Sequence, residues 1–222
     1  VYLQLALVAK PDHTFALAAL ASAQEQAQRY EDAIGTYDKI TKGSPLQSAI
    51  DIRKAFNLNS LEKPDEAQAL LDDLAKREPK DVRPLEALGN IMRARKRYDE
   101  AVKYFSQAIN IIGKPDERHW TFYYARGTAY ERMKNWPAAE ADLKRALALA
   151  PDQPLVLNYL GYSWIDQGKN MKEGMRLIEK AVALKPDDGY IVDSLGWAHY
   201  KQGNDKEAVR YLERAVEIRP ED

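Results

Sequence analysis

The amino-acid sequence predicts an all-α fold, a solenoid in which antiparallel helix pairs repeat along the chain. Three observations support this prediction. A small residue recurs about every 34 residues, a second small residue follows roughly twelve positions after each first one, and a proline closes most of the repeats. Self-similarity at this period indicates one supersecondary unit per repeat, packed on its neighbours.

Alignment on the small residues divides most of the chain into six repeats, each beginning seven residues before its first small residue. The boundaries are 14–47, 48–81, 82–119, 120–153, 154–188 and 189–222. The first small residues are Ala21, Ala55, Gly89, Gly127, Gly161 and Gly196, and the second are Ala33, Ala67, Ala101, Ala139, Gly174 and Ala208. The closing prolines are Pro45, Pro79, Pro151, Pro186 and Pro220.

Each repeat is expected to form two antiparallel helices, A and then B. Pro154 and Pro137 suit the first turn of a helix A and of a helix B, because proline's missing N–H has no partner there in any case. The "PD" pairs at 151–152 and 186–187 indicate a helix stop followed by a turn. The whole pattern resembles the tetratricopeptide repeat family, and the resemblance implies a right-handed superhelical solenoid whose A helices line a concave groove.

The stretch "LGWAHY" (195–200) places Gly196 inside a predicted helix. A glycine there costs about 1 kcal/mol relative to alanine. We expect the missing side chain to let the A and B helices approach closely where they cross, and the tighter packing of the two backbones to offset that cost.

Two repeats depart from the common length. Four extra residues, "DERH" (116–119), predict that helix A of the fourth repeat starts about one turn early, near Asp116. One extra residue in "DQGKNMKEG" (166–174) predicts a longer turn in the fifth repeat.

Residues 1–13 match only the second half of a repeat, with Leu3, Ala6 and Pro11 at helix-B positions. A helix B without its helix A leaves an apolar face uncovered, and solenoid ends normally carry polar caps. We therefore expect the chain to be a piece of a longer protein.

Composition narrows the function. The 222 residues carry a formal charge of −1, which argues against a nucleic-acid partner because such proteins usually carry a basic excess. The chain has no cysteine and only three scattered histidines, so we expect no metal and no cofactor. No apolar run is long enough to predict insertion into a membrane.

The tetratricopeptide resemblance implies that one face of the A helices lines the groove and binds partners. This face is expected to include Phe15, Ile52, Phe56, Glu86, Thr128, Glu131, Ile165 and Asp166. The candidate partner-binding residues on it are Arg83, Asn90, Tyr124, Asn158, Tyr162, Tyr190, Asp193, Trp197 and Tyr200.

Trp197 and Tyr162 occupy the same position in successive repeats, while Asn158 and Asp193 share another. Aromatic rings beside short polar groups suit an extended segment or a helix of a partner. The alternative is that the two aromatic side chains only fill the space between successive A helices.

The carboxylate clamp that some tetratricopeptide proteins use for chaperone tails is not predicted. Such a clamp needs lysine four positions before an asparagine in the first of its repeats. Asn90 has Glu86 at that position.

These observations favour a non-catalytic scaffold or adaptor that binds a peptide or a partner protein in its groove. The stretches "LNYLGYSWIDQGKN" (157–170) and "DGYIVDSLGWAHYKQGN" (188–204) resemble the C-terminal repeats of proteobacterial cell-envelope tetratricopeptide proteins, which implies a periplasmic or envelope location. A cytoplasmic location is the alternative. Two other functions remain open: a substrate-recruiting arm of a larger enzyme, and a self-association module. The sequence does not predict an oligomeric state.

Overall fold

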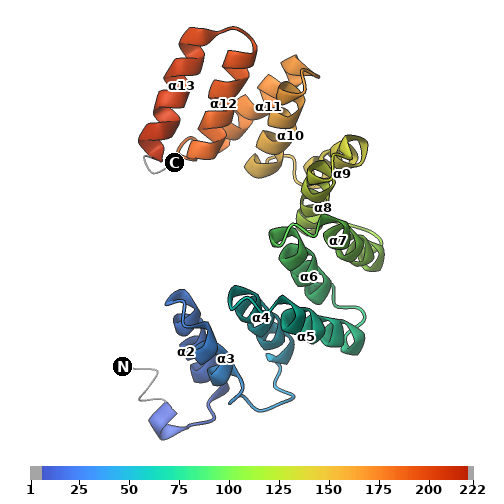
Figure 1. Cartoon of the computed structure of the whole chain (residues 1–222), viewed down its shortest axis with the longest axis vertical. Helices are drawn as coiled ribbons and strands as arrows, with labels where there is room; N and C mark the ends of the chain where they lie inside the picture. Colours follow the sequence, from blue (N-terminus) through green and yellow to red (C-terminus); the bar gives the residue numbers. More distant parts are fainter. Residues whose placement is uncertain (1–6, 220–222) are drawn as a thin grey trace. The chain divides into compact units, whose positions relative to one another are not determined.

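The computed structural model describes residues 7–219, and every element of two or more turns in that range is an α-helix (Figure 1). The helices are α2 (Thr14–Gln26), α3 (Tyr30–Tyr37), α4 (Gln47–Ser60), α5 (Pro64–Arg77), α6 (Arg83–Ala94), α7 (Tyr98–Ile112), α8 (Trp120–Arg132), α9 (Trp136–Leu149), α10 (Pro154–Asp166), α11 (Met171–Leu184), α12 (Gly189–Lys201) and α13 (Asp205–Ile218). A 3₁₀ turn, η1 (Glu117–His119), precedes α8.

The helices pack as consecutive antiparallel pairs, so the prediction of an all-α array of helix pairs is confirmed. The even-numbered member of each pair is the A helix and the odd-numbered member is the B helix. The A helices begin at residues 14, 47, 83, 120, 154 and 189. Part of the proposed half repeat at 1–13, including Leu3 and Ala6, lies outside the described residues, as does Pro220.

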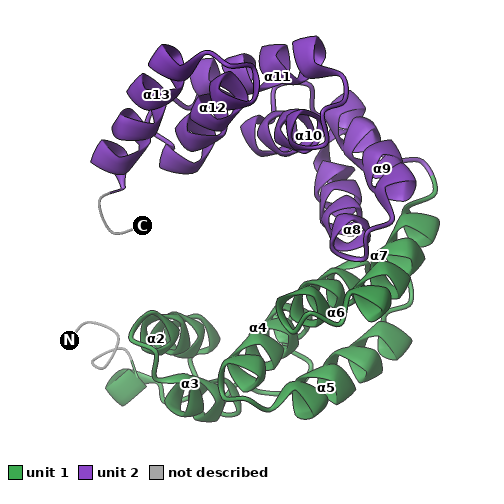
Figure 2. Cartoon of the chain, turned by 45° about the horizontal axis from the view of Figure 1, so that its top comes forward, with its two compact units in different colours: residues 1–113 green, residues 114–222 purple. Residues whose placement is uncertain are grey.

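The pairs fall into two compact units, residues 1–113 and residues 114–222 (Figure 2). In the first unit, α4 contacts α3 and α6 as well as its partner α5. In the second unit, α10 contacts α9 and α12 as well as its partner α11. Each unit therefore buries a core between adjacent pairs, as a solenoid does.

The recurring small residues lie where the A and B helices cross, and all of them are buried. A Cβ atom added to Gly161 would lie 2.7 Å from the carbonyl oxygen of Gly174, the second small residue of the same repeat. One added to Gly196 would lie 2.8 Å from the side chain of Leu212. The crossing is close enough to exclude a larger residue, which explains why glycine is tolerated inside these helices.

Each turn between an A helix and its B helix contains a residue in the left-handed region. These residues are Gln28, Glu62, Lys96, Lys134, Gly168 and Gly203, with φ between 58° and 76°. The following residue donates a hydrogen bond back into the A helix, as from the N–H of Arg29 to the carbonyl oxygen of Gln24 at 2.8 Å. This is the Schellman pattern of helix ends, and it turns the chain by the same amount in each repeat.

The two longer repeats absorb their extra residues outside the α-helices. In the fourth repeat the added turn is the 3₁₀ turn η1, and the carboxylate of Asp116 caps it by accepting a hydrogen bond from the N–H of Arg118 at 2.9 Å. In the fifth, Asn170 takes a left-handed conformation with φ of 44° just before α11. The contact faces of the helices therefore keep their phase.

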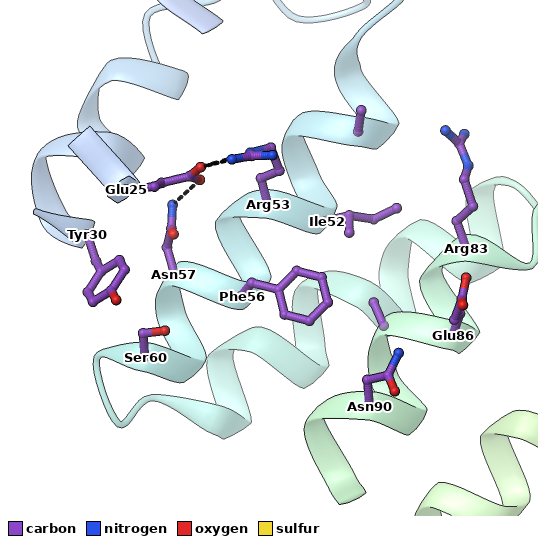
Figure 3. Close-up of a pocket in the computed structure, with 12 residues that line it drawn as sticks. Glu25, Tyr30, Ile52, Arg53, Phe56, Asn57, Ser60, Arg83, Glu86 and Asn90 are labelled. Atoms are coloured by element: carbon purple, nitrogen blue, oxygen red, sulfur yellow. Dashed lines mark hydrogen bonds and ion pairs between the residues drawn. The ribbon is translucent and has the colours of Figure 1, made fainter. Parts of the chain in front are cut away.

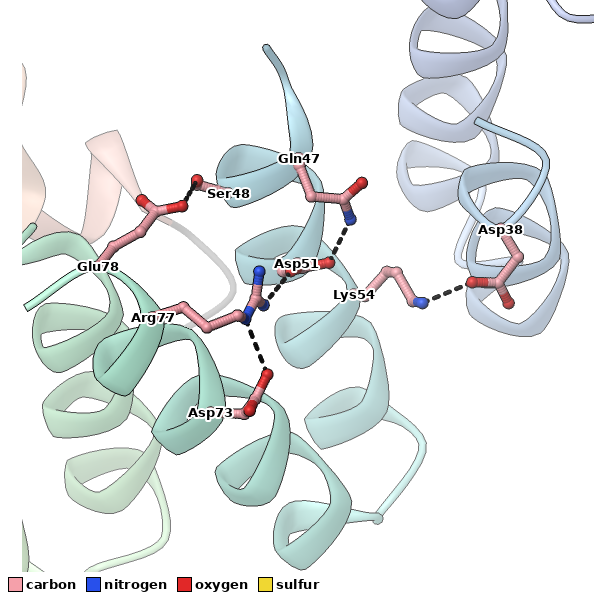
Figure 4. A network of polar contacts seen from close by, with 8 residues as sticks. All are labelled: Asp38, Gln47, Ser48, Asp51, Lys54, Asp73, Arg77 and Glu78. Carbon is pink, nitrogen blue, oxygen red and sulfur yellow. Dashed lines mark hydrogen bonds and ion pairs between the residues drawn. The ribbon is translucent and has the colours of Figure 1, made fainter. Parts of the chain in front are cut away.

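Ion pairs with buried carboxylates join A helices to their B helices. Asp51 of α4 is buried and accepts hydrogen bonds from Arg77 of α5 and from Gln47, each at 2.8 Å (Figure 4). In the second unit, Arg126 of α8 makes two hydrogen bonds to Asp142 of α9, at 2.7 and 2.8 Å. These carboxylates can be buried because their oxygens accept hydrogen bonds from guanidinium or amide groups.

None of the helices between residues 7 and 219 combines the length and the apolar composition that crossing a membrane requires.

Gly161→Ala tests the helix crossing directly. The added methyl group would meet a backbone carbonyl rather than a movable side chain, so we expect the free energy of unfolding to fall by about 1–3 kcal/mol. Thermal and urea unfolding followed by circular dichroism would measure this. Gly35→Ala in α3 is the matched control, because nothing lies within 4 Å of its added methyl group. It should stabilise the protein by about 0.5–1 kcal/mol, and equal effects of the two changes would contradict the packing explanation.

Candidate functional site

The A-helix face of the first unit contains a pocket of about 620 Å³. Residues of α2, α4 and α6, together with Tyr30 at the start of α3, line it. It includes two of the candidate residues, Arg83 and Asn90. Ile52, Phe56 and Glu86, which the sequence also places on this face, line it as well (Figure 3).

One wall of the pocket is a hydrogen-bonded group that joins α2 to α4. The carboxylate of Glu25 accepts hydrogen bonds from Arg53 Nε at 2.9 Å and from Asn57 Nδ2 at 2.8 Å. Asn57 is buried, so this bond satisfies an amide that water cannot reach. The hydrogen bond to Glu25 raises the pKa of the Arg53 guanidinium.

The opposite wall is α6, along which Arg83, Glu86 and Asn90 follow one another (Figure 3). Arg83 donates to both carboxylate oxygens of Asp81, with Nε at 2.9 Å and Nη2 at 2.6 Å from them. Burial acts to raise the pKa of Asp81, but the hydrogen bonds from Arg83 outweigh it and the pKa is lowered. Asn90 accepts a hydrogen bond from Arg93 Nη2 at 3.3 Å.

Apolar side chains fill the space between the two walls. Phe56 lies in the middle of the pocket and is 40% exposed, although it is a large aromatic side chain. Ile52 lies one turn before it on α4, and Ala49 and Ala87 also line the pocket. The pocket thus combines an apolar centre with a polar rim, as ligand sites commonly do.

The A-helix face of the second unit carries aromatic side chains. Tyr162 on α10 is 37% exposed, and on α12 Tyr190 is 64% and Tyr200 is 57% exposed. Trp197 is half-buried, and its ring centroid lies 5.4 Å from that of Tyr200. The indole Nε1 of Trp197 is shielded from solvent and has no hydrogen-bond partner within the described residues.

The Tyr162 hydroxyl interacts electrostatically with three carboxylates. Burial raises the pKa of Tyr162, and the negative charges of Asp166, Asp193 and Glu131 raise it further. Tyr162 and Asp193, both candidate residues, are therefore brought close together from α10 and α12.

Other candidate residues mainly make contacts inside the unit. Tyr124 packs edge-on against Tyr159 with ring centroids 5.7 Å apart, beside the core cluster around Leu157. The Oδ1 atom of Asn158 is shielded from solvent and has no hydrogen-bond partner among the described residues. The ring of Tyr190 lies beneath the Arg219 guanidinium at 3.5 Å.

The structure differs from the expected face at several positions. Thr128 and Ile165 are buried, because each turns toward the core of its repeat. Arg53 and Asn57, which are one turn apart on α4, were not predicted to line the pocket. Their i, i+4 spacing places them on a common helix face, but only the position of Glu25 on the neighbouring helix shows what they bind.

No three His, Cys, Asp or Glu side chains within residues 7–219 are grouped so that they could hold a metal ion. The arrangement on both units offers aromatic rings, amides and paired charges, which are groups for binding.

Comparison with known families identifies tetratricopeptide repeats along most of the chain. Four tetratricopeptide repeat models match residues 16–47, 81–152, 124–189 and 192–222. A TPR repeat-containing protein of Pseudomonas aeruginosa is 30% identical over 215 residues, which cover 93% of this chain and 34% of that protein. The chain thus spans about a third of the length of this relative.

Solved structures of other repeat proteins share the fold. A structure of Pseudomonas aeruginosa pilF has a TM-score of 0.75 at 15% identity, covering 94% of this chain and 93% of that one. MamA from Desulfovibrio magneticus has a TM-score of 0.66 at 22% identity, covering 82% and 99%. YrrB, described as a TPR protein with an unusual peptide-binding site, has a TM-score of 0.53 at 16% identity, covering 99% and 93%.

Glu25→Ala should destabilise the first unit. It would leave the buried Asn57 amide and the Arg53 guanidinium without their acceptor, so we expect a loss of roughly 1–3 kcal/mol of unfolding free energy in urea titrations. Glu213→Ala, an exposed position on α13, is the control and should change stability by less than about 0.5 kcal/mol. A Glu25→Ala protein as stable as the control would show that the group contributes nothing to the fold.

Tyr159 makes stability sensitive to alkaline pH. Burial, and then the Glu131 carboxylate that accepts its hydroxyl hydrogen bond at 3.0 Å, raise the pKa of Tyr159 above the ordinary value near 10. The raised pKa contributes to the free energy of unfolding, and this contribution is complete below pH ~10. It is lost as the pH rises above that value. Urea unfolding at pH values from about 9 to about 11 should show this fall. The free energy of unfolding of the Tyr159→Phe protein should fall less steeply with pH, and its slope should be smaller by up to about 1.4 kcal/mol per pH unit. Equal slopes for the two proteins would refute the assignment.

Proposed function

Because the chain belongs to the tetratricopeptide repeat family, we propose that it is a non-catalytic scaffold that holds a peptide or partner protein against its A-helix faces. Arrays of such repeats present extended surfaces on which partners bind. Each unit has a packed side, which keeps the helices in place, and an exposed side, on which a partner can be recognised.

The observation that carries this proposal is the exposure of aromatic side chains along one face. Tyr162 and Tyr200 are exposed on neighbouring A helices, and the half-buried Trp197 packs beside Tyr200 with its ring tilted by 35°. Tyrosine and tryptophan supply much of the binding energy at protein interfaces, because they bury large rigid surfaces and keep a polar group for hydrogen bonding. Asp193 adds a carboxylate beside these rings.

The charged groups of the face are paired within the chain. The Glu25–Arg53 and Asp81–Arg83 pairs are joined by direct hydrogen bonds.

We propose a location in the bacterial cell envelope, because the stretches at 157–170 and 188–204 resemble envelope tetratricopeptide proteins. Fractionation of cells that express the full-length gene with a C-terminal epitope tag tests this. The proposal requires the tag in the periplasmic or membrane fraction, and recovery with cytoplasmic markers would overturn it.

The second function that the sequence leaves open is a recruiting arm of a larger enzyme. The chain covers 34% of its Pseudomonas relative, so a large part of that relative lies outside the matched region. If that part were an enzyme, the repeats would be a recruiting arm for its substrate. The two functions differ in whether the full-length protein contains a catalytic domain.

Replacing Trp197 and Tyr162 together by alanine tests the binding face. We expect the loss of two aromatic anchors to reduce partner capture in a pull-down at least tenfold, equivalent to about 1.4 kcal/mol, while the helical circular dichroism signal stays unchanged. The partners are first identified by mass spectrometry of proteins captured by the unaltered chain.

The matched control is Leu184→Ala, which removes an apolar side chain of similar exposure from a B helix. It should leave capture unchanged. If the double variant still captures the partners, the binding surface lies elsewhere. The same conclusion follows if Leu184→Ala lowers capture by an equal amount.

A further inference from the structure

The pocket of the first unit differs chemically from the aromatic face of the second. Its centre is apolar, with Phe56 and Ile52 on α4 (Figure 3), and Ala87 on α6 also lines it. An aromatic ring that is 40% exposed inside a pocket loses its remaining exposure to water once another apolar group covers it. The pocket is therefore suited to receive an apolar group.

The charges around the pocket are already matched within the chain. Arg53 is bound to Glu25 on one wall, and Arg83 is bound to Asp81 at the other. Glu86 also interacts within the chain. A charged ligand group entering the pocket would give up its hydration and would have to break one of these pairs to gain a counter-charge. Charge complementarity therefore selects an uncharged group.

The size and the polar rim indicate what carries that group. A volume of about 620 Å³ exceeds what a small apolar group fills and lies within the usual range of ligand pockets. Asn90 uses its oxygen to accept a hydrogen bond from Arg93, which leaves its amide N–H groups for an acceptor on a ligand. A main-chain carbonyl next to the inserted side chain is such an acceptor.

We propose that this pocket binds an extended peptide segment through one bulky, uncharged apolar side chain that packs against Phe56 and Ile52. The flanking main chain accepts a hydrogen bond from Asn90. This inference rests on the proposed scaffold function and adds the chemistry of the recognised segment. Leucine, phenylalanine and tryptophan are the side chains that satisfy it, and lysine, arginine, aspartate and glutamate are excluded.

The test uses capped tripeptides, acetyl-Gly-X-Gly-amide, titrated into the whole chain labelled at its Ile and Ala methyl groups for NMR. With Leu, Phe or Trp at X, the methyl signals of Ile52, Ala49 and Ala87 should shift and saturate at millimolar peptide. With Lys or Glu at X, binding should be at least tenfold weaker.

Phe56→Ala should weaken binding of the Phe and Trp tripeptides at least fivefold. The matched control is Phe15→Ala, which removes an even more exposed phenylalanine, 70% exposed on α2, that does not line the pocket. It should leave binding unchanged. If Phe56→Ala reduces the helical signal, Ile52→Thr, which alters the same apolar centre, takes its place. Asn90→Ala should weaken tripeptide binding but not the binding of free indole.

The proposal is overturned if charged tripeptides bind best, if no tripeptide shifts these methyl signals, or if Phe56→Ala and Phe15→Ala behave alike. The pull-down with the Trp197 and Tyr162 double variant tests the second unit. Its result does not depend on the tripeptide titrations. Normal partner capture with no tripeptide binding would therefore reject the pocket chemistry while leaving the scaffold function in place.

Discussion

The close crossing of the A and B helices is the constraint on which each repeat depends. At this crossing the backbones approach so closely that a Cβ on Gly161 would lie 2.7 Å from a carbonyl oxygen. The same place in the other repeats is occupied by alanine or glycine, and all of these residues are buried. Dense packing at one point strengthens the van der Waals attraction along both helices, which offsets the low helix propensity of glycine.

Fixing the crossing also fixes which side chains face outward. The crossing turns one face of each helix toward its partner, so the positions on the opposite face point outward, and residues three or four positions apart share a face. The turns contribute to this by repeating one left-handed residue, at a cost of roughly 1 kcal/mol where the residue is not glycine, as at Lys134. The extra residues near η1 and Asn170 lie outside the α-helices, so they leave the outer face unchanged.

This dependence explains what could be predicted from sequence. The spacing of small residues predicts the helix pairs, and counting from them places Ile52, Phe56, Arg83 and Asn90 on one face, where the structure finds a pocket. The pairing of Arg53 with Glu25 could not be predicted in this way. It depends on the angle and distance between α2 and α4, which local periodicity does not contain. The contact between the Tyr190 ring and Arg219, which follows α13, could not be predicted from local periodicity either.

The separation between packing positions and face positions gives the two units different chemistry on the same backbone plan. The residues at the crossing are restricted to glycine and alanine by space, whereas nothing in the crossing restricts the residues at the outer face. The first unit uses this freedom for Phe56 between charge-matched walls, and the second uses it for Tyr162 among carboxylates. A partner is therefore selected by residues that lie outside the helix crossing. For this reason the fold, which many proteins share, identifies a binding scaffold, while the side chains of each face determine what it binds.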